Sequence, residues 1–199
     1  MLNIKVVIGS TRPNRFSEKP ARWIYEEVKK KDGVDAELLD LRDYPMPFFD
    51  GPIAPSAGGG KYSNEVVRRW ADKITEGDAF IIVTPEYNHG YPAVLKNALD
   101  STYPEWNRKA VGFVGYGAVG GARSIEQLRL VAIELQMVPI RNSIHISGEV
   151  YMAVMNESAP VNPELFKALR TGRRDRVEAF LSELIWTAGA MKSARETNH

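Results

Sequence analysis

The sequence contains no cysteine among its 199 residues. Disulfide bonds, thiolate nucleophiles, iron–sulfur clusters and cysteine-type zinc sites are therefore excluded, and any redox chemistry needs a bound cofactor. No apolar run approaches the roughly 18 residues of a membrane-spanning helix, so we expect no membrane partner. The formal net charge is only +1, which gives no reason to expect nucleic acid as a partner.

The chain also lacks the residue spacings that define metal and hydrolytic sites. His89 and His145 are far apart, and no His, Asp and Glu spacing resembles a metal site. No serine lies in a G-x-S-x-G elbow, and no loop matches G-x-x-x-x-G-K-[ST]. We therefore expect no metal and no catalytic side chain, and we interpret His89 as a surface or cofactor-adjacent residue.

The N-terminus enters a strand-like apolar run at once. No basic segment followed by an apolar one precedes Ile4, so we expect no secretory signal and predict a cytoplasmic protein. With 44% hydrophobic and 26% charged residues, the chain has the composition of a globular protein, and its length fits one core. We predict a single domain over residues 1–192 and a disordered tail over 193–199.

Apolar runs alternate with helical patterns along the chain. Runs of five or six apolar, often β-branched residues are typical of strands covered on both faces. Apolar residues at helical spacing predict the intervening helices. The predicted strands are 4–8, 35–41 (near a sheet edge), 79–84, 110–114 and 138–146, and the predicted helices are 17–31, 62–76, 92–103, 121–136 and 163–191.

This alternation predicts a doubly wound α/β fold. Parallel strands joined by right-handed crossovers place helices on both faces of the sheet. Residues 44–60 and 147–162 show no clear pattern and are predicted to be long loops. The first of these loops contains four prolines and the run Gly58-Gly59-Gly60.

The first strand runs directly into a polar loop that opens a helix. Backbone N–H groups and the helix dipole favour an anion at such a place. The loop adds hydroxyls and two guanidinium groups, which suit a terminal phosphate with several acceptor oxygens. The alternative is that the hydroxyls cap the helix and the arginines are solvated. The candidate residues are Gly9, Ser10, Thr11, Arg12, Arg15, Phe16 and Ser17.

A second loop follows the strand 79–84. In a sheet of order 2-1-3-4-5 the switch point lies between strands 1 and 3, so this loop and the phosphate loop should flank one crevice. The ring of Tyr87 offers a flat face, and Asn88 can bond the polar edge of a heterocycle. The alternative is a tight turn whose aromatic residues pack on the core. The candidate residues are Pro85, Glu86, Tyr87 and Asn88.

A third, glycine-rich loop follows the strand 110–114. Gly115, Gly117 and Gly120 spell G-x-G-x-x-G, but the Rossmann fingerprint belongs after the first strand of such a sheet. We therefore interpret this loop, with Tyr116, as backbone that approaches the edge of a flat ligand.

Together the three loops resemble the NADPH-dependent FMN reductase family of flavodoxin-like proteins, which includes quinone, azo and chromate reductases. The matching stretches are GSTRPxR at 9–15, PEYNHGYPAVLKNALD at 85–100 and YGxxGGxR at 116–123. The resemblance covers roughly residues 2–148. It implies a three-layer flavodoxin-like fold with a five-stranded parallel sheet of order 2-1-3-4-5, FMN as cofactor, and NADPH or NADH as hydride donor.

The resemblance also implies roles for the loop residues. The phosphate would be held by Ser10, Arg12, Arg15 and Ser17, the isoalloxazine would be lined by Pro85, Glu86, Tyr87 and Asn88, and its far side would be bordered by Tyr116, Gly117 and Gly120.

The implied activity is hydride transfer from NAD(P)H through FMN N5 to quinones, azo dyes, free flavin or oxidised metal ions by a ping-pong mechanism. Family members are usually homodimers or homotetramers with the flavin near a subunit interface, where we expect the helix from Pro92 and the loop 44–60. Two alternatives stay open at this point. One is an electron-carrier flavodoxin, which the near-neutral charge disfavours, and the other is a flavin-free nucleotide-binding module of the same fold.

Overall fold

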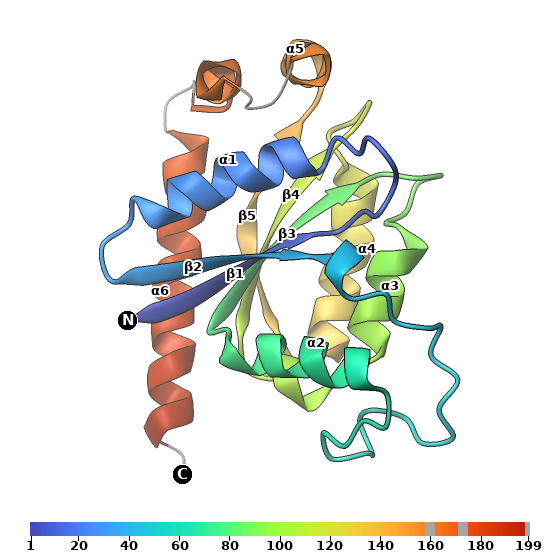
Figure 1. The fold of residues 1–199 in the computed structure, drawn as a ribbon. Helices are drawn as coiled ribbons and strands as arrows, with labels where there is room; N and C mark the ends of the chain where they lie inside the picture. The colour runs from blue at the N-terminus through green and yellow to red at the C-terminus, as the bar shows by residue number, and fades with distance from the viewer. Residues whose placement is uncertain (158–161, 171–174, 198–199) are drawn as a thin grey trace.

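Five strands form one parallel sheet with helices on both faces (Figure 1). This computed structural model describes residues 1–157, 162–170 and 175–197. The strand order β2-β1-β3-β4-β5 confirms the predicted flavodoxin-like α/β fold. The strands are β1 (Leu2–Ile8), β2 (Val34–Asp40), β3 (Ala79–Pro85), β4 (Ala110–Tyr116) and β5 (Val138–Ile146). The α-helices are α1 (Glu18–Lys29), α2 (Glu65–Glu76), α3 (Ala93–Asp100), α4 (Ala122–Glu134), α5 (Gly148–Asn156) and α6 (Arg176–Thr197).

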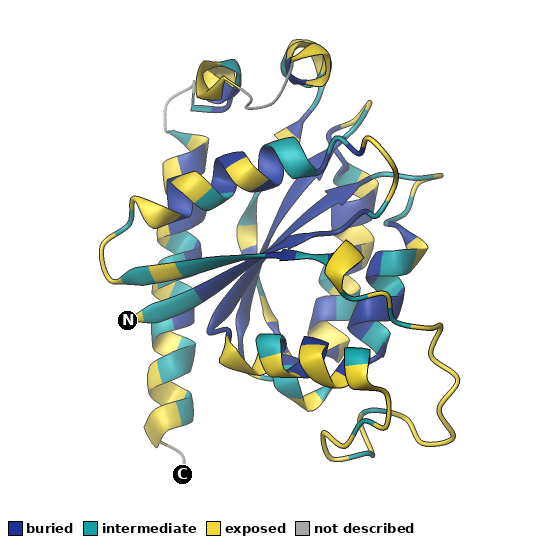
Figure 2. Ribbon diagram, viewed as in Figure 1, coloured by how far each residue is buried: buried dark blue, intermediate teal, exposed yellow. Residues whose placement is uncertain are grey.

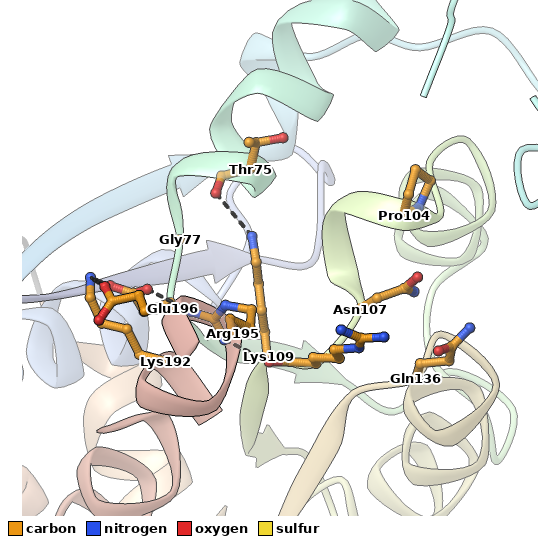
Figure 3. Close-up of a pocket in the computed structure, with 11 residues that line it drawn as sticks. Thr75, Gly77, Pro104, Asn107, Lys109, Gln136, Lys192, Arg195 and Glu196 are labelled. Carbon is orange, nitrogen blue, oxygen red and sulfur yellow. Dashed lines mark hydrogen bonds and ion pairs between the residues drawn. The ribbon is translucent and has the colours of Figure 1, made fainter. Parts of the chain in front are cut away.

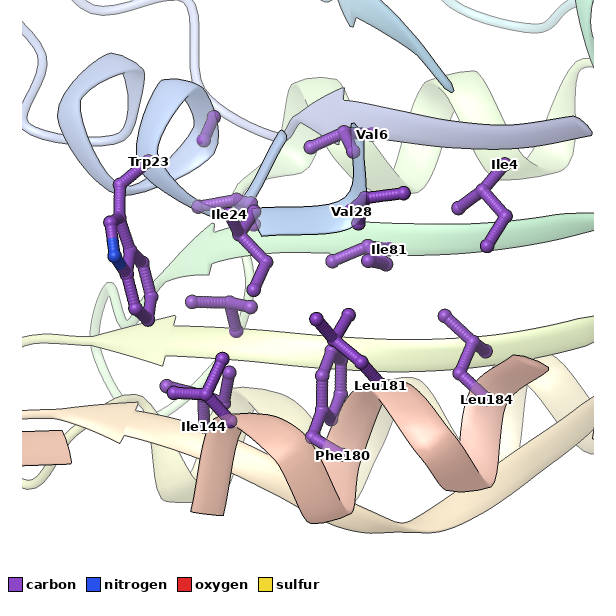
Figure 4. Packing of buried hydrophobic residues seen from close by; sticks show 14 of the residues in the cluster. Ile4, Val6, Trp23, Ile24, Val28, Ile81, Ile144, Phe180, Leu181 and Leu184 are labelled. Carbon is purple, nitrogen blue, oxygen red and sulfur yellow. The ribbon is translucent and has the colours of Figure 1, made fainter. Parts of the chain in front are cut away.

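The sheet separates two hydrophobic clusters because successive strand residues point to opposite faces. In β1, Val6 belongs to the cluster beneath α1 and α6, whereas Val7 belongs to the cluster beneath α2, α3 and α4. Figure 2 shows the central strands buried and the outer helix faces exposed. Figure 4 shows the first cluster, with Ile24 of α1 and Phe180 of α6 on the sheet.

The observed helix ends depend on capping residues more than on the spacing of apolar residues. The predicted helix 62–76 begins later, at Glu65, because the Asn64 side chain accepts hydrogen bonds from the N–H groups of Val66 at 2.9 Å and Val67 at 3.2 Å. The predicted helix 92–103 ends at Asp100, ahead of a short 3₁₀ turn at Pro104–Trp106.

Three predictions for the C-terminal part were wrong. Helix α5 occupies Gly148–Asn156, inside the segment 147–162 that we predicted to be a loop. The predicted helix 163–191 is a 3₁₀ segment at Pro163–Arg170 and a separate helix α6. Residues 158–161 and 171–174 lie outside the described residues. Residues 193–197 belong to α6, where we predicted a disordered tail, and residues 198–199 are not described.

The segment 44–60 contains no helix or strand, as predicted. Asn97 of α3 anchors it, since the Asn97 amide donates to the carbonyl oxygens of Met46 (3.3 Å) and Pro47 (2.9 Å). Asn97 Oδ1 in turn accepts from the N–H of Phe49 at 3.0 Å. Across the described part of the chain, no helix combines the length and apolar character needed to span a bilayer.

Candidate functional site

A cavity of about 420 Å³ lies at the carboxyl ends of β1, β3 and β4. Strands β1 and β3 are neighbours in the sheet, so the cavity is at the topological switch point where ligands bind in open α/β sheets. The predicted residues that line it are Arg12, Arg15, Phe16, Pro85, Glu86, Tyr87, Tyr116 and Gly117. Sequence reasoning missed Asn14, Lys19, Ala118, Tyr151 and Met155.

The first and second loops contact each other directly. The Gly9 N–H donates to the carbonyl oxygen of Val83 in β3 at 2.9 Å. A Cβ atom at Gly9 would lie 2.7 Å from that same oxygen, so only glycine lets the chain leave β1 this close to β3. One residue later, the buried Ser10 Oγ lies 3.1 Å from the Tyr87 hydroxyl. The predicted meeting of the two loops is confirmed.

The two arginines of the first loop have different surroundings. The buried Arg15 guanidinium donates to the Ser10 carbonyl oxygen at 2.9 Å and forms a bidentate ion pair with Asp40 at the end of β2. Burial alone would raise the pKa of Asp40, but the hydrogen bonds and charge of Arg15 hold it below its ordinary value. Arg12 is exposed, with its guanidinium carbon 5.7 Å from the centre of the Tyr87 ring. A phosphate can therefore reach the Arg12 guanidinium, whereas both terminal nitrogens of Arg15 are already paired with Asp40.

Arg15 of the first loop keeps one donor free at the cavity. Its Nε atom is buried without a hydrogen-bond partner among the described residues, and Arg15 lines the cavity. Because buried donors are nearly always satisfied, this N–H group indicates an anionic ligand. Ser17 is the N-cap residue of α1 and makes no capping hydrogen bond, but it does not line the cavity, and its hydroxyl interacts with Tyr116. The Arg15 donor fits the phosphate of FMN.

Thr11 points away from this cavity. It lines a separate cavity of about 300 Å³ with Tyr44 and Asn97, and its carbonyl oxygen accepts from Arg42 Nε at 3.3 Å. The other predicted residues that do not line the main cavity are Gly9, Ser10, Ser17, Asn88 and Gly120.

The second loop is a tight turn. Tyr87 and Gly90 exchange backbone hydrogen bonds of 2.8 and 3.0 Å, and the central residues Asn88 and His89 have φ of 50° and 69°. Two central residues with positive φ are the pattern of a type I′ turn, which asparagine tolerates well. Asn88 is exposed at its tip.

Arg123, in the first turn of α4, anchors this turn. The nearly buried Glu86 carboxylate accepts from the Arg123 backbone N–H at 3.1 Å and pairs with its guanidinium. Burial would raise the pKa of Glu86, but Arg123 holds it below its ordinary value. Arg123 Nη1 also lies 2.8 Å from His89 Nε2. The arginine is therefore engaged with protein groups.

The glycines of the third loop serve different purposes. Gly117, with φ of 130°, lines the cavity. Gly120, with φ of 65°, packs against β5: a Cβ atom there would lie 2.8 Å from His145 Cβ, and its carbonyl oxygen lies 3.0 Å from His145 Nδ1. Gly120 therefore packs the third loop against β5 and does not line the cavity.

Three aromatic rings form one wall of the cavity. The Phe16 ring lies 4.7 Å from each of the rings of Tyr116 and Tyr151, and the two tyrosines stack at 6.5 Å. Burial raises the pKa of the Tyr116 hydroxyl, which stays protonated. Tyr151 and Met155 escaped prediction because we interpreted their segment as a loop. Their i, i+4 spacing is the signal that could have revealed one helix face.

A second cavity, of about 500 Å³, lies at the opposite edge of the sheet (Figure 3). Three of the cations that line it, Lys109, Lys192 and Arg195, already have protein partners. Lys109 donates to the carbonyl oxygens of Ile74 (2.7 Å) and Thr75 (3.0 Å) at the end of α2, and burial lowers the pKa of Lys109 to about 8. Asp78 pairs with Lys192 and Arg195 of α6. We therefore assign these groups to joining α2 and α6 to the sheet.

The different surroundings of the arginines predict different effects on stability. Arg15→Gln is expected to lower the free energy of unfolding by about 3 kcal/mol at pH 7, because it leaves Asp40 without its partner. The pKa of Asp40 is lowered on folding, so this stabilisation is present above its unfolded pKa of about 4 and is lost as the pH falls below it. Urea unfolding at pH 7 and pH 3 measures both values. The exposed Arg12→Gln should change stability by less than about 0.5 kcal/mol, and equal losses in the two variants would contradict the assignment.

The fold and this crevice define a flavodoxin-like α/β protein with a nucleotide-sized site at its switch point. Residues 2–150 match the family described as NADPH-dependent FMN reductase. The chain belongs to this family of oxidoreductases, whose description implies FMN and NAD(P)H.

Relatives and solved structures agree with this assignment. The chain is 43% identical over 134 residues to an NAD(P)H-dependent FMN reductase of Schizosaccharomyces pombe, covering 67% of each chain. It is 30% identical over 145 residues to one of Saccharomyces cerevisiae, covering 68% of this chain and 76% of that one. The fold is similar to that of the NAD(P)H:(acceptor) oxidoreductase FerB of Paracoccus denitrificans, with a TM-score of 0.66, 24% identity, and coverage of 94% and 99%.

Proposed function

We propose that this protein binds FMN in the cavity at the switch point and transfers hydride from NAD(P)H to small acceptors by a ping-pong mechanism. The acceptor class is quinones, azo dyes, free flavin or oxidised metal ions. The observation that carries the proposal is the convergence of the loops after β1, β3 and β4 on one cavity, which is lined by Arg15, Tyr87, Tyr116 and the exposed Arg12.

The first loop would bind the phosphate. Ser10, Arg12 and Ser17 supply hydroxyl and guanidinium donors, and the N–H groups at the start of α1 add the positive end of a helix dipole. Arg15 contributes through its free Nε and by pairing with Asp40, which holds the loop against β2. Gly9 permits the close approach of the loop to β3.

The second and third loops would enclose the flat ring. Pro85, Glu86 and Tyr87 line one side, with Asn88 at the turn, and Tyr116 and Gly117 border the other. Gly120 acts by packing the third loop against β5. Arg123 holds the second loop in place through Glu86.

When bound, FMN would supply the redox chemistry, accepting hydride at N5 and passing it on. The protein residues then have no acid–base role to fill. Glu86 is held as a carboxylate by Arg123, and Tyr116 keeps its proton, so it would act through hydrogen bonds and not as a base. Backbone N–H groups of the loops would stabilise negative charge on a bound ring.

We also propose a homodimer or homotetramer in which the loop 44–60 and α3 face a second copy near the site. Phe48 and Ile53 of this loop are 76% and 62% exposed, and apolar side chains exposed to this extent are typical of interfaces.

The absorbance spectrum of the purified protein tests the proposal. We expect the visible absorbance of a bound oxidised flavin, and rapid bleaching of it by NADPH in a stopped-flow instrument. Apoprotein should bind FMN at least about 100-fold more tightly than riboflavin, because riboflavin lacks the phosphate that makes charge-assisted hydrogen bonds. Arg12→Gln should weaken FMN binding and leave riboflavin binding unchanged.

Three results would contradict it. Flavin that NADPH does not reduce on a catalytic timescale would favour the electron carrier. A colourless protein that takes up no FMN would favour the flavin-free module. A monomer mass in light scattering of the same preparation would contradict the oligomer.

A further inference from the structure

Helix α5 forms the outer wall of the cavity. Tyr151 and Met155, one turn apart on this helix, both line the cavity, and Tyr151 packs on Phe16 and Tyr116. Figure 1 shows α5 beyond the carboxyl ends of β4 and β5. Both residues lie after residue 150, where the match to the family ends, so this wall is a feature of this chain beyond the matched region.

Few buried side chains and no N-cap side chain hold helix α5 in place. It is nine residues long, shorter than the roughly 12 residues that an isolated helix needs to be even marginally stable in water. Val154 is its single buried residue, whereas Met152 and Met155 are more than half exposed. Its N-cap residue, Ser147, makes no side-chain capping hydrogen bond.

Lys19 of α1 closes the other end of α5. Its ammonium donates to the carbonyl oxygens of Val154 at 2.8 Å, Met155 at 3.0 Å and Glu157 at 2.7 Å. Val154 and Met155 lie in the last turn of α5, and Glu157 is its C-cap residue, so the ammonium lies at the helix C-terminus, where a cation interacts favourably with the helix dipole.

The position of Lys19 in α1 also indicates that this residue acts on α5. It is the second residue of α1, where a positive charge opposes the dipole of that helix. Its three hydrogen bonds all go to the end of α5, more than 130 positions away along the chain. The Lys19 ammonium therefore contributes to stability through its contacts with α5 and not through α1.

We propose that Lys19 is a positioning residue that holds α5 against the cavity, and that Tyr151 and Met155 on this wall control how molecules enter and leave the site. This inference rests on the proposed FMN site. Without the ammonium, the C-terminal turn of α5 loses three hydrogen bonds at once, and the wall opens while the phosphate loop keeps its own contacts.

The test compares Lys19→Met with Lys19→Arg. Hydrogen exchange of the α5 amides, measured with and without FMN, is expected to be about tenfold faster in Lys19→Met, because three hydrogen bonds to the helix end are lost. FMN should dissociate about fivefold to tenfold faster, and iodide should quench the bound flavin more strongly. Lys19→Arg, which can still donate to the carbonyls, should restore most of both effects. Lys29→Met, at an exposed ion pair with Glu26 on the same helix, is the matched control and should behave as wild type.

The outcomes separate this inference from the proposed function. Unchanged α5 exchange in Lys19→Met overturns the role of Lys19, whether or not FMN binds. Faster exchange with unchanged FMN release and quenching overturns the role of α5 as a wall. Wild-type protein that takes up no FMN overturns the proposed function and, with it, the role of α5 as the wall of an FMN site. Hydrogen exchange of the α5 amides then still tests the contact between Lys19 and α5.

Discussion

Gly9→Ala is expected to weaken FMN binding by at least about 100-fold. The new methyl group would lie 2.7 Å from the Val83 carbonyl oxygen and 3.1 Å from Leu95 Cδ2. The backbone oxygen belongs to a central strand and cannot move aside, so the loop must leave β3. This movement separates Ser10 from Tyr87 and displaces at least two charge-assisted donors from the phosphate, which corresponds to a loss of about two orders of magnitude. Fluorescence titration of apoprotein with FMN measures the change.

A second glycine provides the control for this prediction. Gly189 lies in α6, and a Cβ atom there would have no neighbour within 4 Å. Gly189→Ala should leave FMN affinity unchanged and increase stability by about 0.5–1 kcal/mol, because alanine favours the helix. Wild-type affinity in Gly9→Ala would show that the phosphate loop does not depend on this close approach.

Phe180→Ala is expected to lower the free energy of unfolding by about 3–5 kcal/mol, the range for removing a buried aromatic side chain. The Phe180 ring is fully buried beneath the sheet (Figure 4). It lies directly over Gly112 of β4, where a Cβ atom would come within 2.6 Å of the ring. The substitution therefore leaves a cavity that no neighbouring side chain is shaped to fill. Urea unfolding, followed by circular dichroism, measures the loss.

Trp186 is the matched control on the same helix. It is 76% exposed, so Trp186→Ala should change stability by less than about 0.5 kcal/mol. Similar losses in the two variants would mean that α6 is not packed on the sheet as described. Helix α6 lies after the residues that match the family, but it completes the core beneath β4 and β5. The expected difference between the two variants would therefore show that the matched region depends on α6 for its stability.

Most of the sheet could be predicted because its signal is local. The runs 79–84 and 110–114 are apolar without interruption, and both are strands buried on both faces, each two residues longer at most than predicted. Loops that follow such strands meet at one edge whatever their sequence, so the contact between Ser10 and Tyr87 was foreseeable.

Helix α5 could not be predicted from local pattern, because it has one buried residue and is held by Lys19 from another part of the chain. For the same reason the cavity residues Tyr151 and Met155 were missed. A short helix with a weak apolar stripe forms only when tertiary contacts satisfy its ends.

The two arginines of the first loop show most clearly what could and what could not be predicted from the sequence. From the sequence, Arg12 and Arg15 are equivalent phosphate candidates, and their clustering with hydroxyls was enough to predict an anion site. Only the tertiary structure distinguishes them, because Asp40 reaches Arg15 from the end of β2 and leaves Arg12 exposed. The sequence by itself determined the alternation of strands and helices and the loops that form the site, since these depend on short-range periodicity and chain connectivity, and the strand order was implied by the resemblance to the family. The tertiary structure decided which charge is free and which helix closes the cavity, since charge pairing and burial depend on residues far apart in the chain.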